Sequence, residues 1–258
     1  MNKLPLFFIL IFGTSVVAQI PMQWQSQLPT SYDYDDMQML DSNSVVAVGL
    51  TGSFIRTNDG GSTWKFVWTN TLMHLTGVDF TDYNTGYACG NGNMYYYEKG
   101  VLLKTNDGGN TWDTLSVPFD ANFSDVDFIS ADTGWVVGDS GNVFRTYTGG
   151  LSWDNVSFTA TEHALSIVML DADTGYVCGE SGFLHRTFDG GNSWTSKPPI
   201  TSNAINSLFF LNGRTGWCTT DFEQIYRTDN SGDTWTRQLN GGGTSPVNSI
   251  YFVDSLHG

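Results

Sequence analysis

The segment 57–64, with the sequence TNDGGSTW, returns four more times and constrains the fold more than any other feature of the chain. The other copies are TNDGGNTW at 105–112, TYTGGLSW at 146–153, TFDGGNSW at 187–194 and TDNSGDTW at 228–235. Their final tryptophans follow one another at intervals of 48, 41, 41 and 41 residues. A fixed period of this size indicates a repeat architecture, in which a residue that recurs at the same place in every copy is expected to be structural.

A second motif accompanies the first. It reads NTGYACG at 84–90, DTGWVVG at 132–138, DTGYVCG at 173–179 and RTGWCTT at 214–220, with a weaker copy, NSVVAVG, at 43–49. In the fourth repeat the apolar runs cover 164–170, 175–178, 183–186 and 193–195, and Gly, Asp, Asn and Ser bound them. No stretch after residue 20 keeps a helical apolar stripe over three turns. Four short strands per repeat predict an all-β fold, a β-propeller of four-stranded blades.

The repeated DGG is expected in the turn between the third and fourth strands, because the glycines adopt positive φ easily and the Asp carboxylate can accept main-chain N–H bonds. Two copies replace this Asp by Thr148 and Asn230, which can still bond locally but cannot supply a carboxylate. The position is therefore interpreted as a structural staple, and not as a metal or catalytic site. The residues assigned to this staple are Asp59, Trp64, Asp107, Trp112, Trp153, Asp189, Trp194 and Trp235.

These motifs resemble the Asp-box, or bacterial neuraminidase repeat (BNR). Together with the TGWxVG segment, they are most similar to propellers of the photosystem II assembly/stability factor family. The resemblance covers about residues 24–258. It implies a propeller with a role in protein assembly on the far side of a membrane, and no catalytic activity. Asp-boxes also occur in sialidases, xyloglucan-cleaving glucanases and sortilin-like receptors, so a carbohydrate-active propeller is the alternative.

The two ends of the chain carry further predictions. Lys3, the apolar run up to Val17 and the small residue Ala18 predict a signal peptide over 1–18, hence a secreted, periplasmic or cell-surface protein with no membrane insertion after cleavage. The segment around Trp24 resembles a lone fourth strand, and 248–258 begin a sixth unit. We therefore expect one propeller domain over 19–258, five full blades plus partial ones, from a ring of six or seven blades that is truncated at its C-terminus.

Composition limits the partners and cofactors that can be expected. With Lys+Arg 11 and Asp+Glu 26, the formal net charge is −15, which disfavours binding to nucleic acid. The three cysteines are expected to be buried free thiols, because Cys89 and Cys178 lie two repeats apart and Cys218 is offset by one position. The four histidines form no ligand motif. No metal site and no cofactor is predicted, and the expected partner is a protein or a glycan.

Two carboxylates are the best candidates for chemistry. Asp79 and Asp127 occupy equivalent places in the first strands of neighbouring repeats, seven residues before the Gly of the second motif. The first strands of a propeller line its central channel. The two carboxylates could therefore form a catalytic pair there. The alternative is that they are hydrogen-bonded or solvated carboxylates of the channel wall with no catalytic role. Asp36, with Asp33, Asp35 and Glu162, is grouped with surface charges. Basic residues directly precede each repeated Thr and are interpreted as structural: Arg56, Lys104, Arg145, Arg186 and Arg227.

One insertion interrupts the repeat. The second repeat has seven extra residues between its second and third strands, within Asn91–Lys99. Tyr95, Tyr96 and Tyr97 are candidate binding residues there, because tyrosine buries much area at a low entropic cost. The alternative is an ordinary extended hairpin. The overall reading is a non-enzymatic protein-binding or assembly scaffold.

Overall fold

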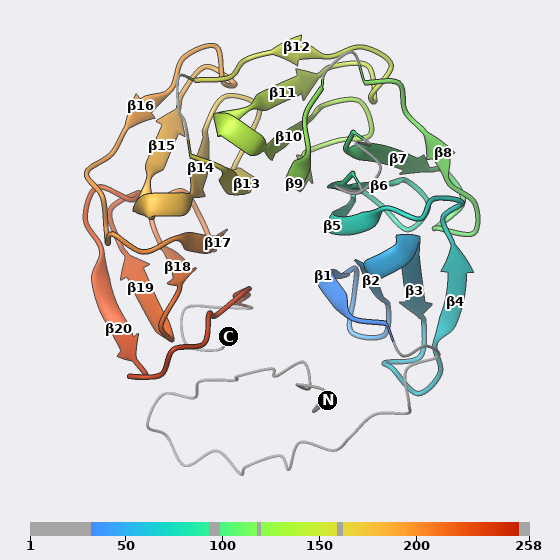
Figure 1. The fold of residues 1–258 in the computed structure, drawn as a ribbon, viewed down its shortest axis with the longest axis horizontal. Coiled ribbons are helices and arrows are strands. Elements are labelled where there is room, and N and C mark those ends of the chain that lie inside the picture. The colour runs from blue at the N-terminus through green and yellow to red at the C-terminus, as the bar shows by residue number, and fades with distance from the viewer. Residues whose placement is uncertain (1–31, 93–98, 118–119, 159–161, 253–258) are drawn as a thin grey trace.

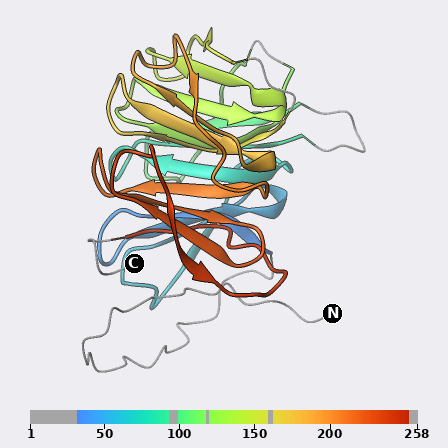
Figure 2. The same cartoon turned by 90° about the vertical axis from the view of Figure 1, so that its left-hand side faces the viewer.

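The computed structural model describes residues 32–92, 99–117, 120–158 and 162–252. Five four-stranded antiparallel sheets follow one another around a central axis, and each sheet keeps its strands in chain order (Figure 1). The predicted all-β propeller of four-stranded blades, with five full blades, is confirmed. Seen from the side, the blades are stacked flank to flank and their strands run along the central axis (Figure 2).

The strand bounds show how regular the repeat is. Blade 1 contains β1 (Tyr34–Met39), β2 (Val45–Gly49), β3 (Ser53–Thr57) and β4 (Lys65–Trp68). Blade 2 contains β5 (His74–Phe80), β6 (Gly86–Asn91), β7 (Val101–Thr105) and β8 (Asp113–Thr114). Blade 3 contains β9 (Phe123–Phe128), β10 (Gly134–Gly138), β11 (Val143–Thr146) and β12 (Asp154–Asn155).

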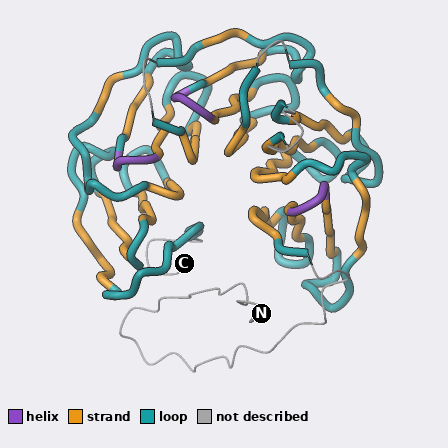
Figure 3. The backbone as a smooth tube through the Cα atoms, in the orientation of Figure 1, coloured by secondary structure: helices purple, strands orange, loops and turns teal. Residues whose placement is uncertain are grey.

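The last two blades follow the same order. Blade 4 contains β13 (Ala164–Met169), β14 (Gly175–Gly179), β15 (Leu184–Thr187) and β16 (Thr195–Ser196). Blade 5 contains β17 (Ile205–Phe210), β18 (Gly216–Thr220), β19 (Gln224–Thr228) and β20 (Thr236–Asn240). Single-turn 3₁₀ helices join the second and third strands of blades 1, 3 and 4 (Figure 3): η1 (Leu50–Gly52), η2 (Asp139–Gly141) and η3 (Glu180–Gly182). In the part of the chain that the structure describes, no helix is long and apolar enough to span a bilayer.

The outer strands differ from expectation. The outer strands β8, β12 and β16 are short, with only two residues each. In the fourth repeat the predicted run 193–195 begins two residues too early, since Trp194 precedes β16 (Thr195–Ser196). These outer strands are exposed on the rim, so little burial extends their pairing beyond two residues.

The core lies between the blades. The second strands are apolar at almost every position because both of their faces are covered by neighbouring sheets. In β6, Ala88 packs in the cluster between blades 1 and 2, whereas Tyr87 and Cys89 pack in the cluster between blades 2 and 3. The Phe128 ring of blade 3 stacks on the Tyr87 ring with their centroids 3.4 Å apart. Successive side chains of β6 therefore point alternately into the contact with blade 1 and the contact with blade 3. We call such a contact between neighbouring blades a joint.

The cysteines follow from the same alternation. All three are buried and free. The one-residue offset of Cys218 turns it to the face opposite to that of its counterpart Cys178, but those two faces belong to blades that touch. Cys178 of blade 4 and Cys218 of blade 5 consequently share one hydrophobic cluster. Burial raises the pKa of both thiols well above the usual range, so both are protonated at neutral pH.

Candidate functional site in the central channel

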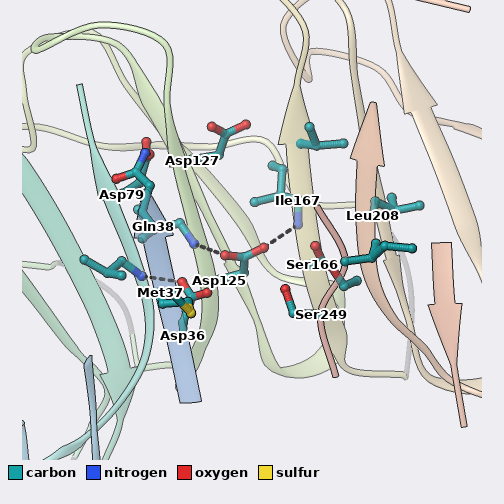
Figure 4. Close-up of a pocket in the computed structure, with 15 residues that line it drawn as sticks. Asp36, Met37, Gln38, Asp79, Asp125, Asp127, Ser166, Ile167, Leu208 and Ser249 are labelled. Carbon is teal, nitrogen blue, oxygen red and sulfur yellow. Dashed lines mark hydrogen bonds between the residues drawn. The ribbon is translucent and has the colours of Figure 1, made fainter. Parts of the chain in front are cut away.

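The first strands β1, β5, β9, β13 and β17 line the central channel (Figure 1). A pocket of about 190 Å³ lies among them. Its polar lining is uneven around the ring. Blades 1 to 3 supply four carboxylates, whereas blades 4 and 5 and the segment that follows them supply hydroxyl groups (Figure 4). These residues are Asp36, Asp79, Asp125, Asp127, Ser166, Ser207 and Ser249.

Each carboxylate binds the main chain of the next blade. Asp79 Oδ2 accepts a 2.7 Å hydrogen bond from the N–H of Phe128. Asp125 Oδ2 accepts one of 3.0 Å from the N–H of Ile167, as Figure 4 shows. Asp127 Oδ2 accepts another from the N–H of Met169. A first strand is the channel-side edge of its sheet, so its outward N–H groups lack a ladder partner. The carboxylates of the preceding blade accept the hydrogen bonds that these N–H groups donate.

Blade 1 uses a carboxylate and an amide for the same purpose. Asp36 Oδ2 accepts a 2.8 Å hydrogen bond from the N–H of Val78, and Gln38 Oε1 accepts one from the N–H of Phe80. The Gln38 amide nitrogen also donates to Asp79 Oδ1 at 2.7 Å. Gln38 and Asp79 occupy equivalent positions in neighbouring blades. A chain of polar contacts therefore runs from blade 1 through blade 2 to blade 3.

The channel raises the pKa of these acids. For Asp36, burial is the main cause and the Asp125 carboxylate adds repulsion, and together they raise the pKa to about 7. Burial raises the pKa of Asp125 to about 6, against the opposing hydrogen bonds from Ile167 and Ser166. Burial also raises the pKa of Asp79 and of Asp127, and the charge of Asp79 raises that of Asp127 further. The hydrogen bonds from main-chain N–H groups lower these pKa values by less than the loss of hydration raises them.

The structure brings some predicted residues together and leaves others apart. Asp79 and Asp127 line the same pocket, but each carboxylate has an oxygen committed to a main-chain N–H. Tyr95, Tyr96 and Tyr97 lie outside the described residues, as do the predicted signal peptide and Trp24. The five basic residues lie in the third strands and not in the channel.

Two channel acids were missed by sequence reasoning. Asp36 is not a surface charge, because it points into the pocket and binds Val78. Asp125 was not singled out at all. The available signal was the two-residue period of a strand: Asp125 lies two residues before Asp127, on the same face of β9. The equivalent place is Gly77 in blade 2, Ser166 in blade 4 and Ser207 in blade 5.

The repeated turn, meaning the five TxDGGxTW copies, lies between the third and fourth strands of each blade. In blade 1, Asp59 accepts hydrogen bonds from the N–H and the hydroxyl of Thr63, at 2.8 and 2.6 Å. In blade 3, Thr148 Oγ1 accepts from the N–H of Ser152, and in blade 5 Asn230 Oδ1 accepts from the N–H of Thr234. The same bond is thus made by three side-chain types.

In blades 1 to 4, the basic residue before the repeated turn ties two blades together. Nη1 of Arg56 donates to the carbonyl oxygen of Gly108 in the next blade. The same relation holds for Lys104 with Gly149, Arg145 with Gly190 and Arg186 with Ser231. Arg227 of blade 5 instead pairs with Asp229 of its own chain segment at 2.8 Å. These cations support the joints and leave the channel without a basic residue among its described lining residues.

The described residues contain no group of three or more His, Cys, Asp or Glu side chains placed to hold a metal ion. The channel carboxylates are spread over three blades and are directed at main-chain N–H groups. The arrangement can bind and exchange protons, and it presents a concentrated negative potential to the pocket.

The family model of the photosynthesis system II assembly factor YCF48 matches residues 104–249, more than half of the chain. The chain belongs to the YCF48 family. The predicted family resemblance is confirmed. The comparison with curated proteins gave no match.

Solved structures with a similar fold include YCF48 proteins and GH74 enzymes. YCF48 from Cyanidioschyzon merolae is 18% identical, with a TM-score of 0.53 over 90% of this chain and 93% of that one. A structure described as YCF48 bound to D1 peptide is 16% identical, with a TM-score of 0.49 over 82% of both chains. An ancestral GH74 enzyme is 17% identical, with a TM-score of 0.65 over 86% of this chain but 33% of the enzyme. At these identities the similarity shows the fold alone.

Proposed function

We propose that this YCF48-family chain is a secreted, non-enzymatic propeller that binds a protein partner and assists its assembly. The observation that carries the proposal is the match of residues 104–249 to an assembly-factor family. The geometry of the channel supports it. Its carboxylates have hydrogen-bonding roles in the scaffold, since Asp79 binds Phe128 and Asp127 binds Met169. A carboxylate that holds two blades together is poorly placed to serve as a mobile acid or base.

The charge of the chain indicates which kind of partner segment it would attract. A net charge of −15 with a carboxylate-lined channel favours a partner segment that carries lysine or arginine. Such a partner would associate rapidly at low ionic strength and more slowly as salt screens the charges.

The test is cross-linking of the affinity-tagged full-length protein in its own organism, followed by mass spectrometry of linked peptides. We expect one predominant protein partner, and we expect a strain that lacks the gene to accumulate that partner unassembled. The signal-peptide prediction is checked on the same material, because the mature protein should begin at Gln19. A partner whose assembly is unchanged in the deletion strain would refute the assembly role.

The second candidate is a carbohydrate-active propeller. One observation favours it: Asp79 and Asp127 line a single pocket and both have a raised pKa, which is a property of the general acid of glycosidases. Purified full-length protein should then release reducing ends from xyloglucan or another β-glucan, or free sialic acid from sialosides. Asp79→Asn and Asp127→Asn should each abolish that turnover. If wild-type protein shows no turnover on these substrates, this candidate is eliminated.

A further inference from the structure

We propose that Asp36, Asp79, Asp125 and Asp127 form a pH-sensitive latch in the channel, which holds blades 1 to 4 together when it carries protons and loosens when it is fully ionised. The proposal is independent of the partner and of the proposed function. It rests on the position of the four groups at the joints, on their mutual proximity and on the lack of compensating charge around them.

The latch spans three joints. Asp36 bridges blade 1 to Val78 of blade 2, and Asp79 bridges blade 2 to Phe128 of blade 3. Asp125 and Asp127 bridge blade 3 to Ile167 and Met169 of blade 4. A carboxyl group can accept these N–H bonds in either protonation state, since its carbonyl oxygen remains an acceptor after protonation. Protonation therefore keeps the bridges and removes the charge.

The joint between blades 4 and 5 has no such group. The positions equivalent to Asp125 and Asp127 hold Ser166 and Val168 in blade 4. This joint is closed by apolar packing, which includes Tyr176 stacked on Phe210 with centroids 4.4 Å apart. The chain thus contains an internal reference: a joint of the same architecture without a carboxylate bridge in the channel, its one ion pair among the described residues, Lys197 with Asp233, lying outside the pocket lining.

No described cation offsets the charge of the latch. Around it, β1 contributes Asp36 and Gln38, β5 contributes Asp79, and β9 contributes Asp125 and Asp127. The facing strands β13 and β17 contribute Ser166 and Ser207, and the segment beyond blade 5 contributes Ser249. From the second strands, the thiols of Cys89 and Cys178 lie near Asp125, and burial keeps them neutral by raising their pKa. His74 of β5 pairs outside the pocket with Asp35 at 2.7 Å.

The direction of the effect follows from proton linkage. An acid whose pKa is higher in the folded state than in the unfolded chain binds more protons when folded. Folding is then most favourable below the unfolded pKa and becomes less favourable as pH rises towards the folded pKa. With Asp125 at about 6 and Asp36 at about 7, the loss falls between about pH 4 and pH 7. An unshifted pKa would make stability independent of pH, and a lowered pKa would make stability rise with pH.

The experiment measures the titration directly. Carboxyl ¹³C NMR of the wild-type full-length protein, between pH 3.5 and 8.5, should give midpoints near 6 to 7 for Asp36 and Asp125. The amide protons of Val78 and Ile167 should shift with the same midpoints, whereas the amide of Leu208 should not. Midpoints below about 4.5 for Asp36 and Asp125 would overturn the proposal. This measurement needs no variant.

Thermal unfolding supplies the second arm. The Tm of the wild type should fall by about 5 °C or more between pH 5 and pH 8. The double variant Asp36→Asn, Asp125→Asn keeps an acceptor at both bridges and removes two of the four acids. It should lose a substantial part of that fall, with a higher Tm than wild type at pH 8. His74→Gln removes a histidine of β5 whose pKa is raised by its hydrogen bond to Asp35, and this variant should retain the fall caused by the latch. A Tm that rises from pH 5 to pH 8, or a double variant with the wild-type slope, would refute the latch.

Discussion

Nη1 of Arg145, in the third strand of blade 3, donates a 2.8 Å hydrogen bond to the carbonyl oxygen of Gly190, in the repeated turn of blade 4. The indole N–H of Trp135 donates to the same oxygen at 3.0 Å. Two buried donors of one blade thus converge on one carbonyl of the next. Arg186 and Tyr176 repeat the relation on Ser231. The cation and the aromatic residue are cross-strand neighbours, so one local pairing builds each joint.

Arg145→Ala should destabilise the propeller by about 2–4 kcal/mol, because it removes a charge-assisted hydrogen bond at a side chain that is only 6% exposed. The measurement is urea unfolding of the purified protein. Arg227→Ala is the matched control. It removes the equivalent cation, which among the described residues pairs with Asp229 of its own blade, and should cost less than about 1 kcal/mol. Equal losses for the two variants would show that the contact between blades contributes nothing.

Asp189→Ala should cost about 1–2 kcal/mol, because the Asp189 carboxylate accepts hydrogen bonds from both the N–H and the hydroxyl of Ser193. Asp189→Asn should cost less than half as much, since Asn230 makes the corresponding bond in blade 5. Differential scanning calorimetry of the two variants checks the order. If Asn proved as damaging as Ala, the charge of the carboxylate, and not its acceptor oxygen, would be the stabilising feature.

Acidification below pH 4 should weaken the fold through the repeated turn. Hydrogen bonds from Thr63 lower the pKa of Asp59 to about 2, and those from Ser193 lower the pKa of Asp189. A lowered folded pKa contributes stability above the unfolded value and loses it as pH falls from about 4 towards 2. Urea midpoints measured from pH 2 to 4 should therefore rise with pH. Asp59→Asn with Asp189→Asn should flatten this rise, and an unchanged slope would assign it to other carboxylates.

Gly138→Ala should be among the most damaging single substitutions in the chain. A Cβ atom at Gly138 would lie 1.9 Å from the main-chain carbonyl oxygen of Asn122. Asn122 directly precedes Phe123, which pairs with Gly138 in the sheet, so the main chain there has little freedom to move away. We expect a loss of about 3 kcal/mol or more, seen as a lower denaturation midpoint and poor soluble yield. Gly213→Ala is the control, because nothing lies within 4 Å of its added Cβ. A well-folded Gly138→Ala protein would contradict the close approach.

Most of the fold could be predicted because the repeat displays its strands, turns and period in the order of the chain. Trp112, for example, belongs to the structural staple that the repeat predicts, and it packs against Phe54 and Phe80 between blades 1 and 2. The outer strands were less predictable. The outer strand Asp113–Thr114, for example, carries no apolar pattern, and its length depends on how many residues stay paired at the exposed edge of the blade.

The candidate site was predicted in part. The equivalence of Asp79 and Asp127 across two repeats predicts a position in the channel for both, and in the structure both line one pocket. Their hydrogen-bond partners could not be predicted, because Phe128 and Met169 belong to other blades and lie 49 and 42 residues away. Asp36 could not be told from Asp35 by sequence, since only the strand register decides which of two adjacent acids faces the channel.

The amino-acid sequence by itself determined the blade, because hydrophobic alternation, positive-φ glycines and local side-chain bonds act over a few residues. It also determined the period, and with it the equivalence of positions between blades. Only the tertiary structure decided which blade each polar group serves. The carboxylate of Asp125 meets the main chain of Ile167, and the guanidinium of Arg145 meets that of Gly190, because blades 3 and 4 pack against each other around the axis. Burial at those contacts, which no local pattern specifies, is also what sets the protonation of the channel.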